Sequence, residues 1–242
     1  MMPPVGENTA LLLDIDGTLL DLARTPDKVT VPDELLRALQ LLSRQLQGAL
    51  ALVSGRSLAS IDRLFAPFRP AAIGAHGGEI RGGDGEVTRA APLPQPVVEI
   101  FEGLAANIPG LLLEDKKCAL ALHYRLAPEA RPVLMSAMES HRKLFDVAQI
   151  DLLHGKAVIE ARHRGVDKGF AVAGLARQEP FAGRAILFGG DDTTDQDVFR
   201  ILPRLGGRGF SVGRQFPGAE YRFENPRAVR QWLVELAHTG VA

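Results

Sequence analysis

Short segments that are almost wholly apolar, each followed at once by small or acidic residues, constrain the fold of this chain most strongly. Three such segments are residues 9–15 (TALLLDI), 49–53 (ALALV) and 185–188 (AILF). Between the first two, leucines recur at helical spacing from Pro32 onward. Strands without alternating polar residues must be covered on both faces, which is typical of parallel sheets with helices on either side. The sequence therefore predicts the α/β fold class.

The pattern changes in the middle of the chain. Residues 77–90 (GGEIRGGDGEVTRA) have the turn chemistry of a hairpin, and a Pro-rich segment follows at 92–96. Residues 97–163 then contain helices and closely paired strands of their own, which favours an antiparallel sheet with helices on one face. We expect a discontinuous core, residues 1–90 and 164–242, interrupted by an inserted α+β domain, residues 91–163.

Individual elements follow from apolar periodicity and capping residues. Further strands are expected near 71–75, 111–115, 118–125, 147–152, 157–161 and 208–212. Helices are expected from Pro32, from Ser57 to about Phe65, near 97–107 and 128–145, from Asp167 to about Arg177, and near 194–202 and 227–238.

Composition excludes several classes of protein. The 242 residues carry 28 basic and 29 acidic side chains, so no global field draws the chain to nucleic acid or to an anionic membrane. The longest apolar runs have five residues, too few to span a bilayer. A secretory signal begins with basic residues, and no Lys or Arg precedes Arg24. The single cysteine, Cys118, excludes an internal disulfide. We expect a cytoplasmic monomer that binds a small molecule.

Two carboxylates, Asp14 and Asp16, stand two residues apart where the first apolar segment ends. Side chains alternate along a strand, so both point to the same side, at the strand end where α/β sheets bind ligands. One carboxylate can attack phosphorus while its neighbour transfers protons. Both would repel a phosphate unless a divalent cation, Mg²⁺ by preference, lies between them. The alternative is a strand that merely ends in an Asp–Gly turn.

A second acidic cluster follows the apolar segment 185–188. Its sequence is GGDDTTD, and Asp191 and Asp195 could complete the oxygen shell of the same metal ion. The alternative is an Asp-rich loop that caps the next helix, where aspartate is favoured in any case.

Two weaker signals concern phosphate binding. Ser54 and Gly55 follow a strand and could bind a phosphate oxygen, although a Ser–Gly pair is more often only a turn. Lys168 opens a helix, where the helix dipole disfavours a cation. A lysine kept at that place indicates a paired or catalytic group, and the alternative is a solvated surface side chain.

Taken in order, DIDGT, SGR, DKG and GDDTTD resemble the motifs of the haloacid dehalogenase (HAD) superfamily. The resemblance implies an HAD-like Rossmannoid core in which Asp14 is the nucleophile, Asp16 the general acid and base, and Thr18 their support. It implies that Ser54 and Lys168 bind the phosphoryl group. It also implies that Asp14, the backbone carbonyl of Asp16 and Asp191 bind Mg²⁺, with Asp195 orienting or completing the shell.

A finer resemblance is to the trehalose-6-phosphate phosphatases, through GAHGGEIR, LEDKKCALALHYR and VIEARHRGVDKG, although Gly78 and Lys117 depart from the family pattern. It implies that the insertion is a sugar-recognising α/β cap. Glu114, Lys116, Arg125 and Glu160 would surround the non-reacting sugar, and Arg56, His76 and Gly77 would lie on the core side of the cleft.

The physical case for the four cap residues is weaker. A disaccharide offers many hydroxyl groups, and charged hydrogen-bond partners discriminate between sugars better than apolar pockets do. Glu114, Lys116 and Glu160 could instead be solvated edge charges, Arg125 could form a structural ion pair, and His76 could be a structural histidine.

The expected function is Mg²⁺-dependent hydrolysis of trehalose 6-phosphate through an aspartyl-phosphate, in trehalose biosynthesis. One alternative is a phosphatase or phosphomutase with the same core that acts on another sugar phosphate, such as sucrose phosphate or mannosyl-3-phosphoglycerate. A second alternative is a non-catalytic sugar-phosphate sensor, which would usually have lost the nucleophile or the acid.

Overall fold

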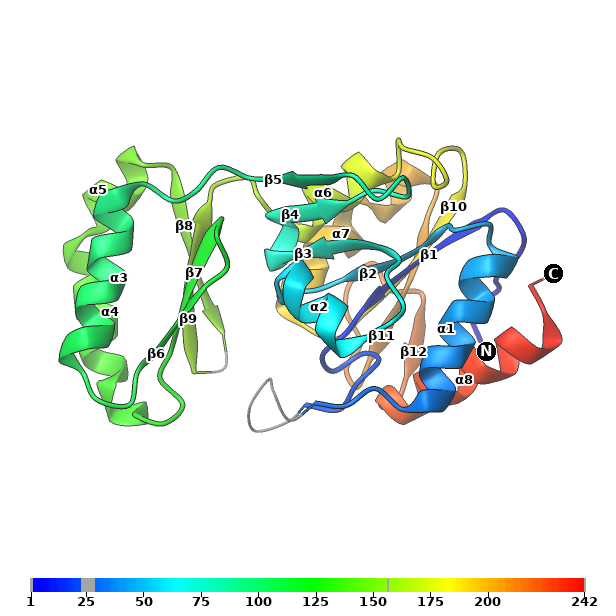
Figure 1. Cartoon of the computed structure of the whole chain (residues 1–242), viewed down its shortest axis with the longest axis horizontal. Coiled ribbons are helices and arrows are strands. Elements are labelled where there is room, and N and C mark those ends of the chain that lie inside the picture. The colour runs from blue at the N-terminus through cyan, green and yellow to red at the C-terminus, as the bar shows by residue number, and fades with distance from the viewer. Residues whose placement is uncertain (1, 23–28, 156, 242) are drawn as a thin grey trace. The chain divides into compact units, whose positions relative to one another are not determined.

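The computed structural model describes residues 2–22, 29–155 and 157–241, which form two compact units (Figure 1). The core unit consists of the residues up to Thr88 and those from Asp167 onward, and the cap unit is the insertion Arg89–Val166. The expected boundaries, after residues 90 and 163, lie two and three residues from these positions.

A single eight-stranded sheet runs through the core unit, in the order β12-β11-β10-β1-β2-β3-β4-β5. The strands are β1 Thr9–Asp14, β2 Leu50–Val53, β3 Ala71–Gly74, β4 Glu79–Arg81, β5 Val87–Arg89, β10 Ala185–Gly190, β11 Arg208–Val212 and β12 Tyr221–Phe223. Strands β12 to β3 are mutually parallel, and β4 turns back antiparallel to β3. All residues of β1, β2 and β3 are buried, as the continuous apolar sequences require.

The core helices are α1 Asp33–Gln45, α2 Leu58–Leu64, α6 Lys168–Leu175, α7 Gln196–Ile201 and α8 Pro226–Thr239, with short 3-10 helices at Ala75–Gly77, Thr193–Asp195 and Leu202–Leu205. Three of the core helices, α2, α6 and α8, begin after a residue whose side chain caps the helix. The Ser57 and Asp167 side chains accept hydrogen bonds from the backbone N–H groups of Ser60 and Phe170, which satisfies otherwise unpaired donors. Helix α1 packs against α8, and α6 packs against α7.

The cap unit contains an antiparallel sheet in the order β6-β7-β9-β8. Its elements are α3 Gln95–Asn107, β6 Leu112–Asp115, β7 Ala119–His123, a 3-10 helix Pro128–Ala130, α4 Arg131–Ser140, α5 Arg142–Val147, β8 Ile150–Gly155 and β9 Val158–His163. The three α-helices cover one face of the sheet (Figure 1), where Phe101 and Phe145 pack with Ile159 and Ala161. By strand alternation, Glu160 and Arg162 belong to the other face.

Two predicted elements differ from the structure, and one strand was not predicted. The helix expected at 128–145 is interrupted at His141, whose Nδ1 lies 2.8 Å from the Ala137 carbonyl oxygen and so competes for the helix hydrogen bonds. The strand expected at 147–152 begins only at Ile150, because α5 runs to Val147 and Gln149 adopts a left-handed φ of 56°. Strand β12, only three residues long, was not predicted because it is too short to show alternation.

Among the described helices, none combines the length and apolar character needed to cross a membrane.

Candidate active site

Four parallel strands of the core sheet end at one edge, and most of the predicted site residues lie there. Asp14 is the last residue of β1, Ser54 follows β2, the turn Ala75–Gly77 follows β3, and Asp191 follows β10. Strands β10, β1, β2 and β3 are neighbours in that order, so residues far apart in the sequence meet at this edge.

Lys168 lies at the centre of the site. Its Nζ donates hydrogen bonds to Asp14 Oδ1 and to Asp195 Oδ1, each at 2.7 Å. All three side chains are buried, with 3%, 6% and 0% of Lys168, Asp14 and Asp195 exposed. A lysine at the start of a helix, unfavourable beside the helix dipole, is thus compensated by two carboxylates.

Burial and charge act in opposite directions on this ion pair. Burial alone would lower the pKa of Lys168, but the negative charges of Asp14 and then Asp195 outweigh it and hold the pKa above its usual value. For Asp14, burial raises the pKa, Lys168 lowers it, and the charges of Asp195 and Asp191 raise it again, so the pKa lies well above the usual range. The raised pKa of Lys168 keeps the ammonium charged, so we treat the contact as an ion pair.

Asp191 completes an acidic cluster with Asp14 and Asp195, in which one oxygen of each lies within 4.8 Å of the others. Burial, followed by the charges of Asp195 and Asp192, raises the pKa of Asp191 to about 6. Thr18 Oγ1 donates a 3.3 Å hydrogen bond to Asp191 Oδ1 and is fully buried.

Gly17 is required at this point for two reasons. Its φ of +89° is a left-handed conformation that favours glycine, and a Cβ atom there would overlap the Asp191 carboxylate. The chain therefore brings a backbone turn directly against the acidic cluster.

The cluster fits a divalent cation. Three carboxylates surround one ammonium group, so the site has an excess of negative charge; burial first, and then the charges of the neighbouring carboxylates, raise the pKa values of Asp14 and Asp191. A hard cation with oxygen ligands would lower both pKa values. Asp195 is less available as a ligand, because its Oδ2 accepts 2.9 Å hydrogen bonds from the backbone N–H groups of Asp191 and Asp192 while its Oδ1 holds Lys168.

Asp16 makes a contact that the sequence did not suggest. Arg56, expected on the sugar side, binds the Asp16 carboxylate with both arms of its guanidinium, through Nε–Oδ2 at 2.6 Å and Nη2–Oδ1 at 2.7 Å. The Arg56 side chain is 11% exposed and that of Asp16 is 30% exposed. Such bidentate pairs fix the orientation of a carboxylate as well as its charge.

The turns after β2 and β3 pack closely around the cluster. Ser54 is buried, and its Oγ accepts a 3.1 Å hydrogen bond from the Arg56 backbone N–H, which shapes the turn. A Cβ at Gly55 would overlap the His76 ring, so His76 lies directly on this turn. Ala75, His76 and Gly77 all have left-handed φ values, of 47°, 52° and 107°, and a Cβ at Gly77 would overlap the Asp167 carbonyl, just before Lys168.

The predicted cap residues separate into two contacts and one exposed side chain. Lys116 and Glu160 form an ion pair in which both side chains are less than a tenth exposed. Glu114 Oε2 lies 3.0 Å from His123 Nε2, a partner that was not predicted although both residues have the strand period of the same face. Arg125 follows β7 and is exposed.

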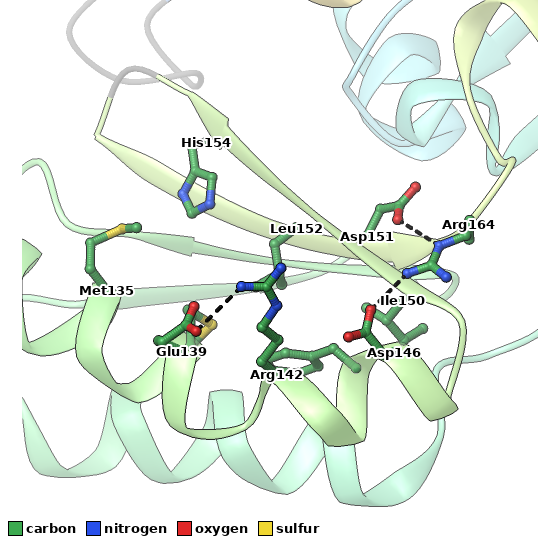
Figure 2. A pocket seen from close by; sticks show the side chains of 11 residues that line it. Met135, Glu139, Arg142, Asp146, Ile150, Asp151, Leu152, His154 and Arg164 are labelled. Carbon is green, nitrogen blue, oxygen red and sulfur yellow. Dashed lines mark hydrogen bonds and ion pairs between the residues drawn. The ribbon is translucent and has the colours of Figure 1, made fainter.

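A separate cavity of about 240 Å³ opens in the cap unit between α4, α5 and β8 (Figure 2). Met135, Ile150 and Leu152 contribute its apolar lining. On its rim Arg142 pairs with Glu139 at 3.4 Å, and Arg164 pairs with Asp146 and Asp151. None of the predicted site residues lines it, and its arginines are already compensated, so we assign it no ligand.

The sequence is similar to those of known phosphatases. The model of the trehalose-phosphatase family matches residues 12–217. A probable trehalose-phosphate phosphatase from Sinorhizobium fredii is 46% identical over 223 residues, which are 88% of this chain and 81% of that protein. The trehalose-6-phosphate phosphatase of Escherichia coli is 38% identical over 235 residues, or 96% of this chain and 87% of that protein.

Solved structures of similar proteins match the fold of this chain over almost its whole length. The C-terminal domain of a C. albicans trehalose-6-phosphate phosphatase matches with a TM-score of 0.80 and 25% identity, over 96% of this chain and 93% of that one. A trehalose-6-phosphate phosphatase related protein matches with a TM-score of 0.78 at 24% identity, over 96% of this chain and 98% of that one, and supports the fold alone. Both matches span the core and cap units.

Proposed function

This chain belongs to the trehalose-phosphatase family, and from that membership we propose that it hydrolyses trehalose 6-phosphate to trehalose and inorganic phosphate. The observation that carries the proposal is the buried cluster in which Lys168 bridges Asp14 and Asp195 beside Asp191. It supplies a nucleophilic carboxylate, a cation for the phosphoryl oxygens and the ligands for a metal ion at one sheet edge.

Asp14 is the nucleophile of the proposed reaction. One of its oxygens attacks phosphorus in line, the bond between phosphorus and the sugar oxygen breaks, and Asp16 gives its proton to that oxygen. Asp16 then takes a proton from water, which attacks the aspartyl-phosphate, releases phosphate and restores the Asp14 carboxylate. Arg56, bound to both Asp16 oxygens, orients this acid and stabilises the carboxylate form that the first step leaves.

The remaining core residues stabilise charge on the transferred group. Lys168 contributes a fixed ammonium, and Ser54 and Gly55 contribute the turn that faces the phosphate. Asp14, Asp191 and the backbone carbonyl of Asp16 would hold Mg²⁺, which supplies charge neutralisation for the phosphate and lowers the pKa of the carboxylates around it. We assign Asp195 a positioning role, since its oxygens are engaged by Lys168 and two backbone N–H groups.

We assign recognition of the non-reacting sugar to the cap unit. Lys116, Glu160 and Glu114 lie on the sheet face that the cap helices do not cover, and Arg125 follows the same sheet. Charged donors and acceptors held in fixed pairs can hydrogen-bond to sugar hydroxyl groups. A sugar that lacks one of these hydroxyl groups would leave a buried charge without its hydrogen bond and would bind less well.

The test is Mg²⁺-dependent phosphate release from trehalose 6-phosphate, measured against glucose 6-phosphate and sucrose 6-phosphate. We expect kcat/KM to be highest for trehalose 6-phosphate and activity to disappear in a chelator. Equal rates on the three substrates would show that the cap residues do not select trehalose. A requirement for a sugar-bisphosphate activator would instead indicate a phosphomutase.

A further inference from the structure

Arg162 is a buried charged side chain that the proposed mechanism does not use. It belongs to β9 of the cap unit and is 8% exposed. Its Nε and Nη1 atoms are buried and have no hydrogen-bond partner among the described residues. A buried cationic donor without an acceptor is costly, so its presence requires either a structural reason or a ligand.

The neighbouring strands explain why these two nitrogen atoms of Arg162 have no partner among the described residues. In the sheet register Arg162 lies opposite Ala119 of β7 on one side and Asp151 of β8 on the other. Ala119 offers only a methyl group. Asp151 is already bound by Arg164, at 3.0 Å between its Oδ1 and the Arg164 Nε.

The acid two residues earlier on the same strand also has a partner. Glu160 lies two residues before Arg162, on the same face by strand alternation, and it forms the buried ion pair with Lys116. The Lys116 backbone N–H donates a hydrogen bond to the carbonyl oxygen of Ala119, the residue opposite Arg162 in the sheet register. Among the residues that the structure describes, the face thus carries two buried cations, Lys116 and Arg162, for one buried carboxylate.

We propose that Arg162 is a sugar-binding residue of the cap, whose guanidinium donates hydrogen bonds to hydroxyl oxygens of the disaccharide. The inference rests on the proposed function, because trehalose 6-phosphate has neutral oxygen acceptors in its non-reacting sugar. A guanidinium presents a planar set of N–H donors and no acceptor, which suits such oxygens and excludes a ligand made of donors alone. Hydrogen bonds to a bound sugar would satisfy Nε and Nη1, for which the described residues provide no acceptor.

A ligand role and a structural role predict opposite effects on stability. If Arg162 holds the cap together, Arg162→Met destabilises the protein. If Arg162 is a ligand-binding residue, Arg162→Met replaces a desolvated cation with an apolar side chain of similar length. The stability of the ligand-free protein should then stay the same or increase. We expect the Tm of R162M without ligand to equal or exceed that of the wild type.

Binding of trehalose, the phosphate-free product, is the direct measurement. We expect R162M to weaken trehalose affinity in calorimetry about ten- to a hundredfold, the effect of losing a charged hydrogen bond. The ratio of kcat/KM for trehalose 6-phosphate to that for p-nitrophenyl phosphate should fall by a similar factor. Arg142→Met is the matched control, because it removes the same charge from an exposed position on α5 and leaves Asp151 bound to Arg164, so this ratio should stay unchanged.

A second variant keeps the test decisive if R162M does not fold. Arg162→Lys retains the charge but replaces the fork of donors with a single ammonium, so we expect trehalose affinity to be only partly restored. Wild-type trehalose affinity in R162K or R162M would overturn the inference. So would a fall in Tm with an unchanged substrate ratio, or Arg162-dependent protection by inorganic phosphate but not by trehalose.

The failure of this inference and of the proposed function can be told apart. If the wild-type protein does not prefer trehalose 6-phosphate to p-nitrophenyl phosphate, the proposed function fails. If the wild type shows that preference and the Arg162 variants retain it, only the role of Arg162 fails.

Discussion

The two units bury charge in opposite proportions. In the core unit Asp14, Asp191 and Asp195 surround Lys168, which makes three carboxylates for one ammonium. In the cap unit Lys116 and Arg162 accompany Glu160, which makes two cations for one carboxylate. Neither set is neutral by itself, and buried charge is expensive when it is not compensated. The acidic excess points to a bound cation and the basic excess to a ligand rich in acceptor oxygens.

The largest effect should come from Asp14, the proposed nucleophile. Asp14→Asn keeps the size of the side chain but lacks the attacking carboxylate, so we expect turnover of trehalose 6-phosphate to fall at least about 10⁴-fold. Thermal unfolding should show an intact core, and Asp84→Asn, in an exposed turn, is the control. Phosphate release well above background in D14N would remove Asp14 from the role of nucleophile.

Asp191→Asn tests the acidic excess directly. Removing one ligand charge should lower kcat/KM at fixed Mg²⁺ on the order of a hundredfold, partly recoverable at higher Mg²⁺. The pKa of Asp191 is raised to about 6, so its ionised form destabilises the metal-free protein above that pH. We therefore expect D191N to have a higher Tm than the wild type at pH 7 in chelator, by a margin that shrinks toward pH 5.

The same pKa predicts how the metal requirement varies with pH. Below about pH 6 a metal ion must displace a proton from Asp191, so the Mg²⁺ concentration for half-maximal activity should rise as the pH falls. A D191N protein less stable than the wild type in chelator at pH 7 would contradict the raised pKa of Asp191, which burial and then the charges of Asp195 and Asp192 cause.

Lys116→Met tests the basic excess of the cap. It leaves Glu160 buried without its cation, so we expect a loss of about 3–5 kcal/mol of stability, whereas the double variant K116M/E160M should recover much of it. For trehalose 6-phosphate we expect kcat/KM to fall about ten- to a hundredfold, with a smaller loss for p-nitrophenyl phosphate. Equal losses on both substrates would argue that Lys116 is structural.

Gly77→Ala perturbs the core without removing a charge. The added Cβ would overlap the Asp167 carbonyl in a backbone that already has a left-handed φ of +107°, and it would displace Lys168 from the carboxylates. We expect kcat to fall about tenfold equally for trehalose 6-phosphate and p-nitrophenyl phosphate. A loss confined to the disaccharide would instead assign Gly77 to sugar binding.

The smallest effect concerns the turn beside Lys116. Lys117 adopts a φ of +71°, which glycine tolerates and β-branched residues do not. In urea denaturation we expect Lys117→Gly to be neutral or stabilising by up to about 1 kcal/mol, and Lys117→Val to be destabilising by about 1–2 kcal/mol. Equal stability of the two variants would show that this turn relaxes freely.

The fold class and the core cluster could be predicted because both follow from strand ends. Asp14 and Asp191 come directly after apolar segments, and parallel strands bring such positions to one edge whatever their separation along the chain. Lys168 was identifiable because a lysine at a helix start needs a compensating partner.

Contacts that depend on side-chain direction could not be predicted in the same way. Arg56 could have pointed to the cleft or to Asp16, and only its rotamer decides between them. His123 and Arg162 belong to β7 and β9, and alternation along each strand predicts only which face they share. Their neighbours depend on the register between strands, which the local sequence does not encode. The break at His141 depends on one side chain competing for a backbone carbonyl.

The pairing of β1 with β10 has a consequence for how the protein is made. These central strands lie on either side of the inserted cap in sequence, so the ribosome synthesises β2 to β5 and the whole cap before β10 exists. At ordinary elongation rates β1 waits roughly ten to thirty seconds with one edge unpaired. The strand pairs of the cap sheet are all internal to it and can form during that wait. Lys168 and Asp195 are also synthesised after the cap, so phosphatase activity requires that synthesis has passed Asp195.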